Sequence, residues 1–167
     1  MRCLEVGPGT DRSYRFSPSA TVGCEEVVFL DIEEPEPSLK RFGEWVVADA
    51  EMLPFRSGVF DKIWSSHVIE HLEDPALYLY NIYRVLRRGG SAVIRTPNFL
   101  SRNAYRDPDH KHVFSYLALR RLARRAGFKV HTPGCAAGTL LPKPVVKLLT
   151  LFTALVKDEV EVVLRRV

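Results

Sequence analysis

The first residues that could bind a ligand lie almost at the N-terminus, where Gly7 and Gly9 form a glycine-rich turn. Apolar Leu4 and Val6 precede this turn and indicate the end of a buried strand. Glycine adopts backbone dihedrals that a side chain forbids, and it lets a ligand approach the bare backbone. A strand followed at once by such a turn is typical of the cofactor corner of a doubly wound α/β sheet, and also of a tight turn without a ligand.

Two acids follow further apolar runs, and each could hold part of a nucleoside. Asp31 ends the run at residues 27–30, and Asp49 ends the run at residues 45–48. A carboxylate after the second strand accepts hydrogen bonds from ribose hydroxyls, and one after the third can accept from an adenine amine. The dinucleotide fingerprint requires glycine at position 12, which is Arg12, so an adenosine-bearing cofactor is favoured over a nicotinamide dinucleotide. The alternative is that both acids only cap loops.

Four histidines form two closely spaced pairs, His67 with His71 and His110 with His112. A spacing of four residues places two side chains on one helical face, where they can share a metal ion, with Glu70 at the edge of that face. The sequence indicates no third ligand, and His-x-His is frequent in loops. We therefore expect no metal site, and packing or capping is an equally good role for any one of these histidines.

The elements that must position these residues alternate between strand and helix. Strands are expected up to Val6 and at 27–30, 45–48, 60–65, 92–94, 128–130 and 159–166. Helices are expected at 38–42, from Asp74-Pro75 to Gly89-Gly90, from Ser115 to Gly127 and, weakly, within 11–26. This order predicts an α/β fold, a Rossmann-like, doubly wound, seven-stranded and mostly parallel sheet with an antiparallel C-terminal hairpin.

Length and composition are those of an ordinary globular protein. The 167 residues suit a single domain over 1–167, with 46% hydrophobic residues and a formal net charge of +4. Lysine and arginine are spread along the chain without an aromatic-basic motif, so we expect no nucleic-acid partner. Cys3, Cys24 and Cys135 are odd in number and widely spaced, which argues against a disulfide framework or structural zinc and favours a reducing compartment. With no signal peptide apparent, the expected location is the cytoplasm.

Several loose motifs occur in a specific order. They are residues 4–9, Asp31, residues 49–55, 60–63, 66–72, 86–90 and 126–128. In this ordered set the chain resembles the class I S-adenosylmethionine-dependent methyltransferases, most closely the small-molecule, methyltransferase type 11-like branch that includes quinone-biosynthesis enzymes. The resemblance implies S-adenosylmethionine as cofactor and S-adenosylhomocysteine as product.

The resemblance also implies which residues hold the methionine part and the sulfonium. Glu5, Gly7 and Gly9 would surround the methionine part. Ser66 and His67, just past the fourth strand, would lie beside the sulfonium.

For the adenosine part, the resemblance implies three further contacts. Asp31 would accept from the ribose hydroxyls, Asp49 from the adenine amine, and the backbone of Ala50 would meet the ring edge.

Methyl transfer requires mainly alignment of the acceptor and exclusion of water, because the sulfonium already activates the methyl carbon. A base is needed only when the acceptor carries a proton at neutral pH. Its place beside the cofactor makes His67 the first candidate base, followed by His71 and His110. We expect methyl transfer to an unidentified small-molecule acceptor. The alternatives are a non-catalytic cofactor-binding or interaction module of the same fold and, more distantly, a nicotinamide oxidoreductase.

The segment 140–157 is not explained by the sheet, because residues 145–156 are almost all apolar. It is too short to span a bilayer, which takes about 20 apolar residues. A buried helix is one interpretation. The other is a cover that replaces the helices that such methyltransferases usually have before the first strand. That cover would be a lid, a homodimer contact or a peripheral membrane contact.

Overall fold

The computed structural model describes residues 1–10, 22–131 and 158–167. Within them, one seven-stranded sheet has the order β3-β2-β1-β4-β5-β7-β6. The strands are β1 (Arg2–Val6), β2 (Glu26–Asp31), β3 (Glu44–Val47), β4 (Phe60–Ser66), β5 (Leu86–Pro97), β6 (Lys129–His131) and β7 (Glu159–Arg165). The helical segments are η1 (Lys40–Phe42), η2 (Ala50–Met52), α2 (Pro75–Val85), α3 (Asn103–Arg106) and α4 (Tyr116–Arg125).

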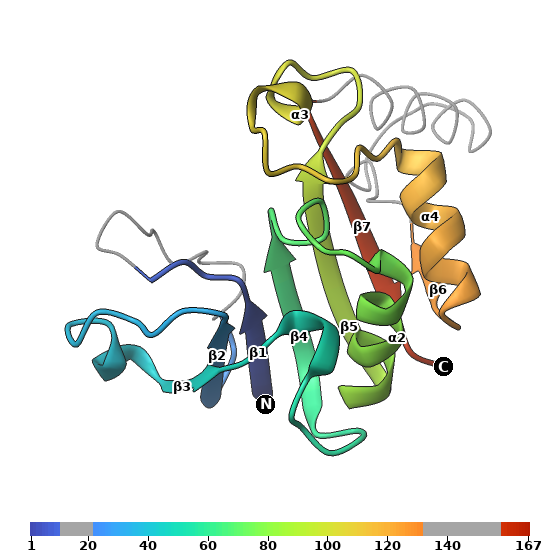
Figure 1. Ribbon diagram of the computed structural model, residues 1–167. Helices are drawn as coiled ribbons and strands as arrows, with labels where there is room; N and C mark the ends of the chain where they lie inside the picture. The colour runs from blue at the N-terminus through green and yellow to red at the C-terminus, as the bar shows by residue number, and fades with distance from the viewer. Residues whose placement is uncertain (11–21, 132–157) are drawn as a thin grey trace, which may run out of the picture.

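Strand directions confirm the predicted fold class. Strands β1 to β5 run parallel to one another, whereas β7 runs antiparallel to both β5 and β6 (Figure 1). The strand order reverses between β1 and β4, so this is the switch point at which open α/β sheets bind ligands, beyond the carboxyl ends of their strands. The loop with α3 lies beyond the carboxyl end of β5, at the top of Figure 1.

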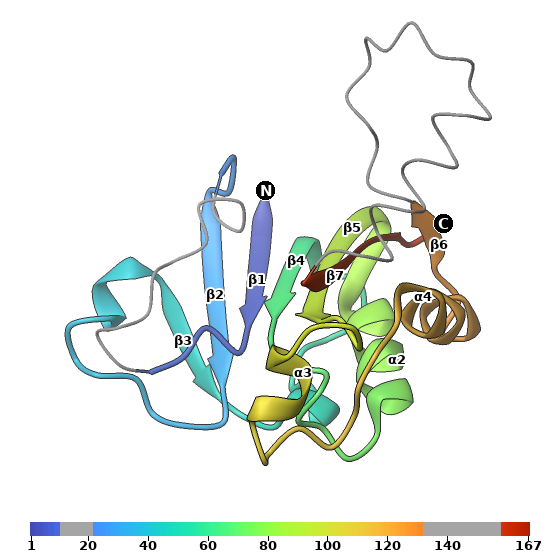
Figure 2. The same cartoon turned by 90° about the horizontal axis from the view of Figure 1, so that it is seen from above.

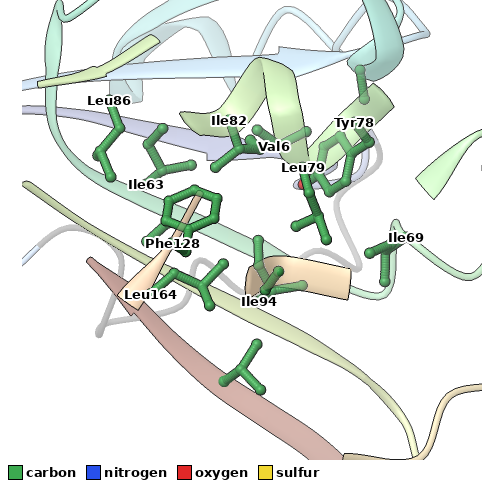
Figure 3. Packing of buried hydrophobic residues seen from close by; sticks show 14 of the residues in the cluster. Val6, Ile63, Ile69, Tyr78, Leu79, Ile82, Leu86, Ile94, Phe128 and Leu164 are labelled. Carbon is green, nitrogen blue, oxygen red and sulfur yellow. The ribbon is translucent and has the colours of Figure 1, made fainter. Parts of the chain in front are cut away.

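Strand β1 is central to the sheet and largely apolar apart from Arg2 and Glu5. It pairs with β2 on one side and with β4 on the other, and residues 3–6 are each no more than 3% exposed. Val6, Ile63 and Ile94 from the strands meet Leu79 and Ile82 from α2 in the core (Figure 3). Strands buried on both faces have near-continuous apolar runs, and the run at residues 27–30 made β2 predictable.

Both long helices begin where the sequence predicts. The Asp74 carboxylate accepts hydrogen bonds from the backbone N–H groups of Ala76 and Leu77, and Pro75 is the first helical residue of α2. Ser115 caps α4 by accepting from Ala118. Seen from above, α2 and α4 lie side by side on one face of the sheet (Figure 2).

The predicted end of α2 at Gly89-Gly90 is wrong. The helix ends at Val85, and both glycines lie inside β5, where the register with β4 shifts. A side chain from the other end of the chain supplies the missing termination, because Arg166 Nη1 donates to the carbonyls of Tyr83, Arg84 and Leu86 at 2.5–3.0 Å. No local motif encodes this contact.

The sixth strand also begins one residue later than the predicted 128–130. Phe128 still belongs to the end of α4, because its N–H donates to the Ala123 carbonyl at 3.1 Å and its ring meets Tyr83 edge-on. The weak helix expected within 11–26 falls largely outside the described residues. The apolar segment 140–157, with its lid, dimer and membrane interpretations, falls outside them entirely. Among the described helices, none is long and apolar enough to cross a membrane.

The sequence argument against a disulfide framework missed one bond, because Cys3 and Cys24 form a disulfide with their Cα atoms 6.0 Å apart. Spacing alone could not show this, since 21 residues separate the two positions. The register of the parallel strands explains it: Cys3 pairs with Val27, so the residues just before β2 come back beside the start of β1. The cysteines therefore give no argument for a reducing compartment.

Candidate functional site

The glycine-rich turn follows β1 directly and has the backbone that its sequence predicts. Gly7 and Gly9 have positive φ angles of 68° and 83°, the left-handed region that favours glycine. The N–H of Gly7 donates to the Leu30 carbonyl at 2.8 Å, which ties the turn to the end of β2. A Cβ at Gly7 would lie 2.2 Å from Cγ2 of Val68, so the turn also fits closely against the segment after β4.

The two acids predicted to hold the nucleoside stand at the carboxyl ends of β2 and β3. One Asp31 oxygen accepts the Gly9 N–H at 2.9 Å, so this carboxylate shapes the glycine turn. Asp49 accepts the Glu51 N–H at 2.8 Å and caps η2, of which buried Ala50 is the first residue. Both acids thus cap loops while remaining partly exposed at the edge of the sheet. Their further acceptor positions suit hydroxyl and amine donors.

Buried Glu5 lies one residue before the end of β1, only 3% exposed, beneath the glycine turn. In the sheet it stands between Phe29 of β2 and Trp64 of β4. Its role toward a methionine group stays a prediction.

His67 follows Ser66, the last residue of β4, and has an unusual backbone for a residue with a side chain, at φ 57°. Its ring lies between two carboxylates: Nδ1 is 3.2 Å from Glu70 and Nε2 is 3.1 Å from Glu159. The contact with Glu70 raises the pKa of His67 above its ordinary value of 6.5, partial burial opposes this, and Glu159 adds to it. Glu159 could not be identified as a partner from the sequence, since it comes from the start of the last strand.

His67 and His71 could share one face only if their segment were helical, and it is not. Residues 67–73 form turns, and His71 instead lies against His110, with ring centroids 4.8 Å apart. Glu70, expected at an edge, is 1% exposed. The structure therefore brings together His71, His110 and Glu70, each with a ligand-type atom within 4.8 Å of the others. His112 points elsewhere, with Nε2 3.4 Å from the Glu73 carbonyl.

A hollow of about 490 Å³ opens beside these histidines at the carboxyl end of the sheet. It is lined by His67, Pro97, Asn103, Arg106, Asp107, Pro108 and His110. His67 and His110 thus line the same surface cavity, although they are 43 positions apart in the sequence. This end of the sheet is where open α/β folds bind their ligands.

The sequence of the chain matches known methyltransferases. The family model of the methyltransferase domain matches residues 4–94, more than half of the chain. A mitochondrial 2-methoxy-6-polyprenyl-1,4-benzoquinol methylase of Caenorhabditis elegans is 31% identical over 104 residues, covering 56% of this chain and 36% of that protein. A ubiquinone/menaquinone biosynthesis C-methyltransferase of Ruegeria sp. (strain TM1040) is 34% identical over 103 residues, covering 56% and 41%. The chain spans less than half the length of these relatives.

Solved structures share the fold over nearly the whole chain. An S-adenosylmethionine-dependent methyltransferase of Archaeoglobus fulgidus has a TM-score of 0.70 at 20% identity, covering 99% of this chain and 86% of its own. A putative methyltransferase of Haloferax volcanii, solved with the Trm112 activator, has a TM-score of 0.69 at 15% identity, covering 98% and 81%. The family model and the shared fold point to the same family. The chain belongs to the methyltransferase domain family, among the class I S-adenosylmethionine-dependent methyltransferases.

Proposed function

We propose that this protein is an S-adenosylmethionine-dependent methyltransferase that acts on a small-molecule acceptor. The observation that carries the proposal is the meeting of three strand ends: the glycine turn after β1, Asp31 after β2 and Asp49 after β3 stand at one edge of the sheet. The matched benzoquinol methylase and the matched ubiquinone/menaquinone biosynthesis C-methyltransferase support the small-molecule class of acceptor.

These residues fit an adenosine-bearing cofactor in their chemistry. Asp31 already holds the Gly9 N–H with Oδ2, which fixes the carboxylate beside the turn and leaves acceptor positions for ribose hydroxyls. The glycine backbone of the turn leaves room for a close ligand approach. After β3, Asp49 offers a carboxylate and Ala50 offers backbone hydrogen-bonding groups for the adenine.

Bound S-adenosylmethionine would supply a methyl group activated by its sulfonium. The chain's part is to align the acceptor in line with that methyl group and to exclude water. The hollow beside His67 is the place for the acceptor, because it lies past β4, next to the cofactor corner. His67 in its neutral form is the candidate to receive a proton from the acceptor.

Isothermal titration calorimetry with S-adenosylmethionine, S-adenosylhomocysteine and NAD tests this function. Binding of both sulfur ligands and not of NAD is the expected result, because position 12 is Arg12 rather than the third glycine of a dinucleotide site. Binding of NAD alone would contradict the proposal. Binding of the sulfur ligands without methyl transfer, over a wide panel of quinols, phenols, amines and thiols, would favour a non-catalytic cofactor-binding module.

Replacing Asp31 with alanine should weaken S-adenosylmethionine binding by about 1.5–3 kcal/mol, the cost of losing hydrogen bonds to a charged acceptor. Calorimetry at one salt concentration measures the change. Glu33→Ala is the matched control, because Glu33 is an exposed acid two positions further along the same loop. An equal affinity for wild type and Asp31→Ala, in a protein with an unchanged melting temperature, would show that the ribose is held elsewhere.

Replacing His67 with alanine should lower turnover by about 100-fold or more if His67 is the base, with a smaller effect on cofactor affinity. Transfer of a radiolabelled methyl group to the best acceptor of the panel gives turnover, and calorimetry gives affinity. A proportional loss of turnover and affinity would assign His67 to packing or cofactor binding instead.

A further inference from the structure

We propose that Glu70, His71 and His110 bind a divalent transition-metal ion beside the carboxyl end of β4. One ligand-type atom of each side chain lies within 4.8 Å of the others. Two nitrogen or oxygen ligands of a tetrahedral zinc ion lie about 3.3 Å apart, so closure around an ion requires these atoms to approach one another by up to about 1.5 Å.

The burial of Glu70 is the first independent observation that points to a cation. The residue is 1% exposed, and His67 Nδ1 lies 3.2 Å from its Oε1 as an ion-pair contact. In the described part of the chain, neither carboxylate oxygen accepts a hydrogen bond of regular geometry. A buried carboxylate is costly unless it is both paired and hydrogen-bonded, and a metal ion would give these oxygens a direct ligand bond.

The two histidines are oriented as metal ligands are. Nδ1 of His71 lies 3.3 Å from the Asp109 carbonyl, and Nδ1 of His110 lies 3.1 Å from the Ala104 carbonyl. A carbonyl only accepts, so these contacts favour the tautomer with the hydrogen on Nδ1, which leaves the lone pair on Nε2. Nε2 of His110 also lies 3.9 Å from Oδ2 of Asp107, beyond hydrogen-bond distance. Fixing the tautomer through a backbone carbonyl is the usual outer-shell arrangement of a histidine that binds metal through its other nitrogen.

The backbone holds the two ligand segments together. The Glu70 carbonyl accepts from the N–H groups of Lys111 and His112, at 2.8 and 3.0 Å. The residue that offers the carboxylate therefore also anchors the loop that carries His110. This non-local contact explains why the sequence indicated no third ligand, because the cluster combines residues about 40 positions apart.

Two imidazoles and one carboxylate select the class of metal. Calcium and magnesium prefer oxygen ligands, whereas zinc and related first-row ions accept nitrogen. Three protein ligands are also the number found in zinc sites that keep a position open for water or substrate. His110 lines the hollow beside His67, so an oxygen or nitrogen of a small molecule in that hollow could take the open position. Metal binding by these side chains does not depend on methyl transfer.

The test is a Co²⁺ titration of tag-free full-length protein, stripped with a chelator and followed by visible d–d absorption, with Zn²⁺ competition by calorimetry. One equivalent should bind. Affinity should fall by about 100-fold or more in His71→Ala, His110→Ala and Glu70→Gln, because loss of a ligand costs more than loss of its support. His112→Ala is the matched control and should bind like wild type, since its ring lies outside the cluster.

Melting temperatures measured with and without Zn²⁺ distinguish lost metal binding from a general loss of stability in a variant. Zn²⁺ should raise the melting temperature of wild type and of His112→Ala, and should leave the three cluster variants unchanged. The absence of one-equivalent binding by wild type, or equal binding by the cluster variants, would overturn the proposal. S-adenosylmethionine titrated into the metal-free protein tests the methyltransferase function separately, so either conclusion can fail without the other.

Discussion

Replacing Gly7 with alanine should lower the free energy of unfolding by about 2–5 kcal/mol. About 1–2 kcal/mol comes from placing a side chain at φ 68°, in the left-handed region. The rest comes from overlap, because the new Cβ would lie 2.2 Å from Cγ2 of Val68, and overpacking typically costs about 1–3 kcal/mol. Urea denaturation followed by circular dichroism measures the loss.

Two companion variants separate these causes. Gly89 has a similar φ of 80°, but no heavy atom lies within 4 Å of an added Cβ, so Gly89→Ala should show only the dihedral cost. Adding Val68→Ala to Gly7→Ala should remove the overlap, so the two substitutions should cost less together than the sum of each alone. If Gly7→Ala is no more harmful than Gly89→Ala, the close fit between the turn and Val68 is not what requires glycine.

Reducing the disulfide should lower the free energy of unfolding by about 3 kcal/mol, on the chain-entropy estimate for a loop of this length. The bond joins Cys3 and Cys24, 21 positions apart, so it closes the segment that contains the glycine turn. Denaturation with and without a phosphine reductant measures the loss, and Cys24→Ser should reproduce it without reductant.

Cys135→Ser provides the matched control for a lost thiol. It should leave stability in oxidising buffer unchanged, because the described disulfide uses the other two cysteines. S-adenosylmethionine affinity should also fall on reduction, since the turn after β1 then lies in a segment that the disulfide no longer closes. Equal stability of the oxidised protein and of a fully reduced sample, verified by thiol titration, would contradict the prediction.

The features that the sequence predicts are those whose cause is local. The start of α2 could be predicted because Asp74 and Pro75 supply the cap and the first turn themselves. The turn after β1 could be predicted because Gly7 and Gly9 are the residues that its backbone angles favour. Strand β2 could be predicted because residues 27–30 form an unbroken apolar run.

The features that the sequence missed depend on chain segments that meet only after folding. Cys24 reaches Cys3 through the register of two parallel strands. Glu70 is brought to the loop of His110 because its carbonyl accepts hydrogen bonds from the N–H groups of Lys111 and His112, some 40 positions later. Neither contact has a local pattern, so short-range periodicity and motif spacing could not reveal it.

Strand β7 also bears on how the protein is made. It is synthesised after every other described strand, yet it inserts between β5 and β6 rather than at the edge of the sheet. A nascent chain that ends before Asp158 leaves both neighbours with unpaired edges, which invite pairing with other chains. It also lacks buried Val162 and Leu164, and Arg166, which closes the end of α2. Folding of the sheet therefore remains incomplete until residues 158–167 are available, and a chain without them is the species most exposed to aggregation and to chaperones.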